Sequence, residues 1–443
     1  MLRTILLLLA ALAGLPVAAA DLLSIYREAR DADAVYASAR AAYTAGQEKL
    51  PQGLAGLLPT VSASANTQYN DRDLEFRPPL AAGFLSGTSR YNSNGYAVTA
   101  TQPLFNYQSW ISYQQAKSQV SQAEANFHQA EQDLVLRVAQ AYFDVQVAES
   151  NVTLAAAQKT AIAEQLAQAK RNFEVGTATI TDANDAQARY DLSVSQEIAA
   201  QNDLAVKRHS LAQIINKAPP PLAAIRADLP LVPPAPNQME EWVEQAMGSS
   251  QQVKAARASL EFADQDVSRN RGGHMPSVNA VAGYTDAAQG AGFQIGPGYD
   301  NTTKYVGVQL AVPIYQGGLV NSQVRQAVAN LEKARQDLEN AKRTVAFNTR
   351  QAFLGVTSGI AQVQALKAAL VSTQSSLDST KLGQEVGVRT QVDVLNATQQ
   401  SISARRDYTQ AVYNYVLSAL KLKSAAGTLG EADLVYVNQW LEK

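Results

Sequence analysis

Charged and hydroxyl side chains that could bond one another gather in two similar heptapeptides of this 443-residue chain. The first, GTATITD, begins at Gly176, and the second, GVRTQVD, begins at Gly387. The aspartate that ends each one, Asp182 or Asp393, is placed to cap a following helix. In the second, the guanidinium of Arg389 can bond a carboxylate together with a hydroxyl or carbonyl group. Spacing alone favours the ordinary arrangement, in which Asp182 is a helix N-cap and Arg389 is solvated.

Residue types that catalysis or metal binding would need are scarce and scattered. The chain has no cysteine, and its three histidines, His128, His209 and His274, lie far apart in sequence. The pair Gly317 and Gly318 is not followed by the Lys-Ser/Thr of a phosphate loop, so it is expected to mark a strand-to-helix junction. A net charge of −2 gives no reason to expect a nucleic-acid partner. We therefore expect no enzyme, no metal site and no cofactor.

Both heptapeptides stand between helical patterns in a duplicated sequence. An offset of 211 residues carries Asp182 onto Asp393 and also Tyr142 onto Phe353. In each copy a long pattern rich in small residues stops at the glycine and restarts near the aspartate, which predicts the tip of a helical hairpin. The longest helices would reach roughly 100 Å, and the helix before each hairpin is expected to stack end to end with the returning one. The predicted helices are about 22–50, 103–173 and 182–215 in the first copy, and 239–269, 318–383 and 393–426 in the second.

Between the helices the hydrophobic period changes to two residues, which predicts one β-hairpin in each copy. Four amphipathic strands are too few for a membrane barrel, because the smallest barrels need about eight. Closure would need several chains, and the residues leave their number open. Pro103 and Pro313 are each expected where a strand gives way to a helix. Strands are expected at about 59–69, 96–101, from 276 onward and 305–312, with a polar loop at 71–94 and a Gly-rich loop at 290–298.

The ends of the chain and its middle differ in composition from the repeats. Arg3 precedes a short apolar run, and the small residues before Asp21 suit cleavage of a secretory signal. No later apolar run is expected to be long enough for a transmembrane helix. The C-terminal tail is expected to pack beside the Pro-rich linker. The predicted division is a signal peptide, 1–20, a first structural repeat, 21–216, a linker, 217–237, a second structural repeat, 238–430, and the tail, 431–443.

Together these features resemble the TolC family of bacterial outer-membrane efflux proteins over nearly the whole chain. The most specific parts are Val386–Leu395, Tyr413–Leu429, Val175–Asp182 and the duplicated junction of strand, proline, aromatic residue and helix. The resemblance implies a mainly α fold with β, built of duplicated long helical hairpins plus two β-hairpins. It further implies a trimeric, twelve-stranded outer-membrane β-barrel continuous with a twelve-helix periplasmic α-barrel.

The resemblance also implies an activity and partners. The implied function is a passive outer-membrane channel, the exit duct of tripartite efflux pumps and type I secretion, gated at its periplasmic tip. Drugs or other small toxic molecules are the implied cargo, with proteins as a second class. The implied partners are the other chains of a homotrimer, a periplasmic adaptor (membrane fusion) protein, an inner-membrane pump or ABC transporter, and outer-membrane lipid.

For the tips, the resemblance implies a gate. In the family, polar links between hairpins hold the closed tip, and an acidic side chain faces the pore. Copies of Asp393 from several chains would form a carboxylate ring that attracts cations. The implied site residues are Thr181, Asp182 and Arg389 for the gate latch, Asp393 and Asn396 for the pore constriction, and Gly176 and Gly387 for the tip turns.

The chain departs from the family pattern at the tips. Asn396 stands where the pattern has a second acid, while an Asp-x-x-Asp pair occurs in the first tip as Asp182 and Asp185. Gln384 stands where the pattern has a latch tyrosine. We therefore expect fewer or different links in the closed tip.

Two alternatives to a multipurpose duct stay open. One is an outer-membrane component dedicated to a single type I secretion system. The other is a periplasmic adaptor, which also uses long helical hairpins. An adaptor, however, carries its hairpin once between globular β modules and would not need two strand pairs with one polar face.

Overall fold

The computed structural model of the chain describes residues 19–75, 87–226, 229–291 and 297–442. Most of the predicted signal peptide, 1–20, therefore lies outside the described residues. The chain forms two compact units. The first unit contains Met1–Tyr43, Ala125–Lys254 and Glu339–Lys443, and the second contains Thr44–Glu124 and Ala255–Leu338.

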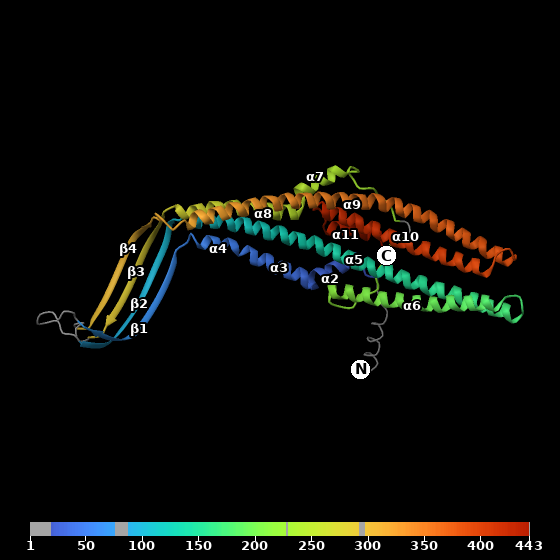
Figure 1. Cartoon of the computed structure of the whole chain (residues 1–443), viewed down its shortest axis with the longest axis horizontal. Helices are drawn as coiled ribbons and strands as arrows, with labels where there is room; N and C mark the ends of the chain where they lie inside the picture. Colours follow the sequence, from blue (N-terminus) through green and yellow to red (C-terminus); the bar gives the residue numbers. More distant parts are fainter. Residues whose placement is uncertain (1–18, 76–86, 227–228, 292–296, 443) are drawn as a thin grey trace, which may run out of the picture. The chain divides into compact units, whose positions relative to one another are not determined.

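Two long helical hairpins dominate the structure, as the duplicated sequence predicts. In the first unit α6 returns along α5, and α10 returns along α9 (Figure 1). Together with a four-stranded sheet they confirm a mainly α fold with β. The helix ends agree closely with the predicted ones, because the glycines and the threonine-aspartate pairs mark them. The bounds are Tyr107–Glu174 for α5, Ile180–Ile215 for α6, Leu319–Glu385 for α9 and Gln391–Ala425 for α10.

The helices that precede each sheet segment are interrupted, so the two continuous helices predicted at 22–50 and 239–269 are wrong. At Asp33 the backbone turns to an extended conformation, and its carboxylate accepts from the Tyr36 N–H at 2.8 Å to cap a new helix. Ser250 breaks the second run in a similar way, with a ψ of 129°. The resulting helices are α2 (Leu22–Ala32), α3 (Ala34–Gln47), α4 (Lys49–Ala55), α7 (Met239–Ser249) and α8 (Gln251–Arg271).

A four-stranded antiparallel sheet lies in the second unit, in the order β1-β2-β3-β4. Each predicted β-hairpin is present, and β2 pairs with β3 to join the two. The strands extend into both ends of the predicted polar loop 71–94, whose residues 76–86 lie outside the described part. Residues 292–296 of the predicted Gly-rich loop lie outside it too. The strands are β1 (Thr60–Leu74), β2 (Gly87–Phe105), β3 (Ser277–Gln289) and β4 (Tyr299–Ala311).

Pro103 does not end its strand as predicted. It pairs with Asn279 inside β2, and the register shifts before Phe105 pairs with Val278. This irregularity accommodates a residue without an N–H in a strand that has neighbours on both sides. Pro313 does follow its strand, because β4 ends at Ala311.

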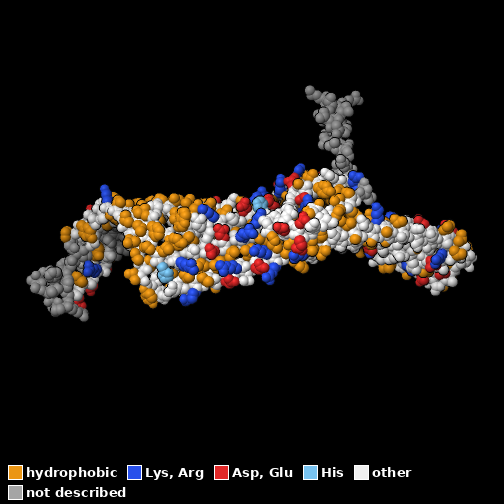
Figure 2. Space-filling model, turned by 90° about the horizontal axis from the view of Figure 1, so that it is seen from above, with side chains coloured by type: hydrophobic (Ala, Val, Ile, Leu, Met, Phe, Trp, Pro, Cys, Tyr) orange, Lys and Arg blue, Asp and Glu red, His pale blue; other side chains and the backbone are white. Residues whose placement is uncertain are grey.

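The register gives the sheet two different faces. In Figure 2 apolar side chains gather over the strands, while acidic and basic side chains are more frequent over the helices. The opposite side of the sheet carries mainly polar or small residues, such as Ser62, Ser64, Thr99, Thr285 and Gln309. The apolar sheet face is made of Val61, Ala63 and Ala65 of β1, Tyr96, Val98 and Ala100 of β2, Ala280, Ala282 and Tyr284 of β3, and Val306, Val308 and Leu310 of β4.

The largest buried cluster lies in the first unit, around aromatic residues of α5 and α10. The rings of Tyr142 and Phe143 meet edge to face at 5.5 Å, and Phe143 lies 5.5 Å from Tyr413. The hydroxyl of Tyr142 donates to the Ala223 carbonyl at 2.7 Å, and that of Tyr415 donates to the Val232 carbonyl at 2.9 Å. Buried tyrosines thus fasten the Pro-rich linker to the helices.

The C-terminal tail packs beside that linker, which confirms the expectation. Ile225 and Leu441 form an antiparallel bridge, and the Glu442 N–H donates to the Ala224 carbonyl at 2.8 Å. The tail begins with helix α11, Glu431–Asn438, whose Leu434 and Val437 are buried.

One helix among the described residues, α9, contains an 18-residue window apolar enough to cross a membrane by length and composition. The prediction that no such run follows the signal is therefore wrong by this criterion. Only 11% of the window is buried inside the chain.

Candidate functional site

Glycine shapes both hairpin tips, here called the first tip (175–182) and the second tip (386–393). Gly176 has a φ of 76° and Gly387 a φ of 80°, in the left-handed region that favours glycine. In the first tip, the Thr177 N–H donates to the Asn172 carbonyl at 2.8 Å; in the second, the Val388 N–H donates to that of Gly383 at 2.9 Å. This six-to-one bond is the Schellman ending of a helix. The two tips therefore share one backbone geometry.

Threonine, not aspartate, caps the helix that leaves each tip. The N-caps of α6 and α10 are Thr179 and Thr390, and the third helical residues are Asp182 and Asp393. Each threonine hydroxyl accepts from the aspartate N–H, at 3.3 and 3.2 Å, while the aspartate carboxylate accepts from the threonine N–H, at 3.0 and 2.9 Å. The prediction that Asp182 and Asp393 are the N-caps is therefore wrong by three residues, because each aspartate is the third helical residue of a reciprocally bonded capping box.

These bonds set the charge state of the tip carboxylates. The Thr179 hydroxyl and then its N–H lower the pKa of Asp182 below its ordinary value. For Asp393, the Thr390 N–H and then its hydroxyl lower the pKa, and the Arg389 charge adds to the effect. Both aspartates are partly exposed and lie at helix N-termini, where negative charge is favoured. They are therefore ionised at neutral pH.

A groove of about 900 Å³ separates the two tips in the first unit, and it places the predicted latch residues on one surface. Asp182 and Arg389 both line it. Among the described residues, no hydrogen bond or ion pair joins Arg389 to Thr181 or Asp182. The Thr181 hydroxyl instead lies 2.6 Å from that of Thr179. The latch within one chain thus stays a prediction.

A different pair joins the two hairpins. The Arg189 guanidinium of α6 donates to the Asn396 side-chain oxygen of α10 at 3.1 Å. Asn396 was expected at the pore constriction, and its side chain is exposed. Sequence alone gave no signal for Arg189, since the two residues lie 207 positions apart.

Two glutamines that line the groove each have one buried side-chain atom without a hydrogen-bond partner among the described residues. These atoms are the side-chain oxygen of Gln165 and the side-chain nitrogen of Gln391. The side-chain oxygen of Gln391 does have a partner, because it accepts a hydrogen bond from the side-chain nitrogen of Gln384. Gln384 thus makes a side-chain contact inside its own hairpin. The groove offers amide groups for bonding beside its charges.

The described residues contain no group of three or more His, Asp or Glu side chains that could hold a metal ion.

Comparisons with known proteins place this geometry in a family. The family described as Outer membrane efflux protein matches residues 25–217 and 242–428. The chain is 33% identical to Outer membrane protein TolC of Vibrio cholerae serotype O1, over 96% of this chain and 94% of that protein. It is 28% identical to the alkaline protease secretion protein AprF of Pseudomonas aeruginosa, over 95% of this chain and 87% of that one.

Solved structures show the same fold. The outer membrane protein VceC of Vibrio cholerae superposes with a TM-score of 0.75 at 17% identity, over 92% of this chain and 96% of that one. A family of this kind consists of transport ducts without enzymatic activity, so the chain is no enzyme, and the adaptor alternative falls. The chain belongs to the outer membrane efflux protein family, and it is an exit duct of the bacterial outer membrane for efflux and type I secretion.

Proposed function

We propose that three copies of the chain close one barrel in the outer membrane. The observation that carries this proposal is the pair of free sheet edges. Among the described strands, β1 pairs only with β2 and β4 only with β3, while the apolar sheet face is open. In lipid every backbone N–H and C=O must be bonded, so the edges of one copy need those of another. Three copies give twelve strands, within the range of known barrels.

The slant of the apolar sheet face supports closure with tilted strands. Val61 lies in one row with Ala100, Ala282 and Val306 through the strand register. β1 begins one residue before Val61, whereas the apolar residues of β4 continue past that row to Leu310. An apolar band that crosses the strands obliquely becomes level with a membrane when the strands tilt by roughly 40°.

The cysteine-free sequence allows a direct test by disulfide mapping. A cysteine at Ala63 of β1 would be combined with single cysteines at Lys304, Val306, Val308 or Leu310 on the same face of β4. Within one chain, β1 and β4 are three strands and roughly 14 Å apart, too far for a disulfide. We expect one combination to give a covalent ladder that stops at three chains. Absence of any ladder, or one that continues beyond three, would contradict the closed trimer.

The tips are proposed as the gate of this duct. Arg389, Thr181 and Asp182 are proposed to form the latch between neighbouring hairpins, and Asp393 with Asn396 the constriction. Support comes from the shared groove, the ionised carboxylates and the exposed Arg389. A detergent-purified oligomer in a planar bilayer is expected to show a small conductance. Intact oligomers that give no current would overturn the pore itself.

The proposed partners follow from the family. They are a periplasmic adaptor protein that meets the tips, and an inner-membrane pump or ABC transporter that supplies drugs, other small toxic molecules or proteins. The relative AprF is named for the secretion of alkaline protease, which favours a dedicated type I secretion role as the second candidate. Deleting the gene and measuring drug sensitivity beside protein secretion distinguishes the two. Drug sensitivity with intact secretion supports the efflux role, and the reverse result supports the dedicated one.

A further inference from the structure

The N-terminal segment of the described chain is held in place before its first helix begins. Ala20 and Leu222 form a parallel bridge between the chain start and the linker. The Ala20 N–H donates to the Pro221 carbonyl at 2.7 Å, and the Ala20 carbonyl accepts from the Ala223 N–H at 3.0 Å. Ala20 therefore uses both of its backbone groups in the fold.

A buried side chain depends on the same residue. The hydroxyl of Tyr142, whose side chain is fully buried, lies 3.0 Å from the Ala20 carbonyl and 2.7 Å from that of Ala223. The hydroxyl hydrogen of Tyr142 is thus shared between two carbonyls, where α5 meets the start of the chain and the linker. Removing Ala20 would leave the Pro221 carbonyl and the Ala223 N–H without these partners, and buried polar groups without partners are costly.

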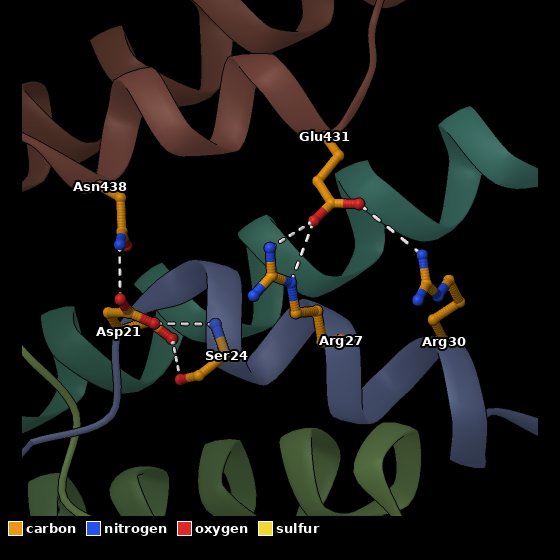
Figure 3. Close-up of polar contacts among 6 residues, drawn as sticks. All are labelled: Asp21, Ser24, Arg27, Arg30, Glu431 and Asn438. Carbon is orange, nitrogen blue, oxygen red and sulfur yellow. Dashed lines mark hydrogen bonds and ion pairs between the residues drawn. The ribbon is translucent and has the colours of Figure 1, made fainter.

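The charge at Asp21, the next residue, also favours a chain that begins at Ala20. Asp21 is the N-cap of α2, and its carboxylate accepts from the Ser24 N–H at 2.7 Å (Figure 3). Its other oxygen accepts from Asn438 of α11 at 2.5 Å. A chain that began at Asp21 would place its α-ammonium on the cap itself, where the partial positive charge of the helix N-terminus opposes a cation.

We propose that export processing cuts between Ala19 and Ala20, so that Ala20 is the first residue of the mature chain and its α-ammonium binds the Pro221 carbonyl. This position differs by one residue from the predicted signal peptide, 1–20. The proposal rests on outer-membrane export and not on the trimer or the gate.

The small-residue pattern is compatible with either cut. A cut after Ala20 places Ala18 and Ala20 three residues and one residue before the bond, and a cut after Ala19 places Val17 and Ala19 there. A leader-cleaving peptidase hydrolyses the Ala19–Ala20 amide with one water. The carboxylate stays on the released peptide, and the Ala20 nitrogen becomes the ammonium. Its bond to the carbonyl is then charge-assisted and stronger than that of an amide.

The test is mass spectrometry of the full chain, expressed with its leader and purified from outer membrane. We expect an N-terminal peptide that begins at Ala20; any other first residue overturns the proposal. Two matched variants check the assignment of the cut. Ala18→Phe places a large residue two positions before the proposed bond and is expected to leave processing unchanged. Val17→Phe, three positions before it, is expected to accumulate precursor or to move the cut. The opposite pattern would place the cut after Ala20.

The bond of the new terminus is tested separately. Deleting Ala20 lets the same cut produce a chain that begins at Asp21, while Ala20→Gly keeps every backbone group. We expect limited proteolysis of the linker to be several-fold faster in the deletion variant and unchanged in Ala20→Gly, because local opening sets cleavage rates. Equal rates in the two variants would overturn the docking of the terminus.

Discussion

Arg189 and Asn396 join the two helical hairpins near their tips, with a guanidinium-to-amide hydrogen bond of 3.1 Å between α6 and α10. The family resemblance directs attention to Arg389 as the link, yet the bond present within one chain is this one. The bond lies about one to two helical turns beyond the capping-box aspartates, where the two hairpins are still close enough for side chains to meet. Separation of the two hairpins at this level would break the bond.

We predict that Arg189→Ala increases the open probability of the channel. A hydrogen bond to a charged group at an accessible site contributes about 1 kcal/mol, so the ratio of open to closed states should rise by about fivefold. Single-channel recording measures this ratio. Arg406→Ala is a matched control on α10, because among the described residues Arg406 pairs with its sequence neighbour Asp407, at 3.2 Å, and with no residue of the other hairpin. Equal effects of the two substitutions would remove the special role of Arg189.

We predict that Arg389→Ala also increases the conductance of the assembled channel and leaves the fold of the single chain unchanged. Within one chain Arg389 lines the groove and is exposed, so its latch partners must come from movement of the tips or from a neighbouring copy. Conductance should rise, while the helix content of the purified chain stays the same. Arg389→Lys keeps the charge but loses the guanidinium fork, and it is expected to restore closure only in part. Unchanged conductance in both variants counts against the latch.

The helix ends and caps at the tips could be predicted well, because they depend on residues that are close together in the sequence. A glycine followed by Thr-x-x-Asp indicates a helix end and a capping box, and both tips have this geometry. The same signature should have identified Thr179 and Thr390, not the aspartates, as the N-caps.

Contacts between distant residues could not be predicted in this way. Asp33 interrupts an otherwise helical pattern, and its carboxylate binds Arg137 at 2.7 Å, a partner 104 positions away. Burial raises the pKa of Asp33, but the Arg137 bond and the Tyr36 N–H outweigh it, so the pKa is lowered. Such a break depends on a partner that only the packed helices provide. The Arg189 and Asn396 bond is invisible in sequence for the same reason.

We predict that Asp393→Asn weakens the preference of the channel for cations. Asparagine keeps the capping oxygen that accepts from the Thr390 N–H at 2.9 Å, so the tip should keep its shape while the charge ring is lost. Asn396→Asp should act in the opposite direction, because it adds a second ring and turns the Arg189 contact into an ion pair. Reversal potentials under a salt gradient measure both. Identical potentials in wild type and Asp393→Asn would remove the ring from the mechanism.

We predict that Val308→Arg prevents stable insertion in the outer membrane, whereas Gln309→Arg is tolerated. The two residues are neighbours on β4 and lie on opposite faces of the sheet. Val308 belongs to the apolar sheet face and is 69% exposed within one chain. Arginine on the lipid side of a barrel costs about 2–4 kcal/mol near the middle of the membrane, and a residue facing the lumen does not bear this cost. Oligomers resistant to detergent would be counted in outer-membrane fractions. A larger loss for Gln309→Arg would reverse the assignment of the faces.

We predict that the free energy of unfolding of the first unit, which contains Tyr413, falls as the pH rises above about 10, with ionisation of Tyr413 in the unfolded chain as one cause. Burial raises the pKa of Tyr413 to about 12, against a value near 10 for an unfolded tyrosine. Between these values the unfolded chain releases a proton that the folded chain keeps, so unfolding becomes more favourable as the pH rises. The midpoint temperature of thermal unfolding, followed by circular dichroism, should therefore fall less steeply with rising pH in Tyr413→Phe than in wild type. Tyr315→Phe, an exposed site, is the control, and equal slopes in all three proteins would exclude the contribution of Tyr413.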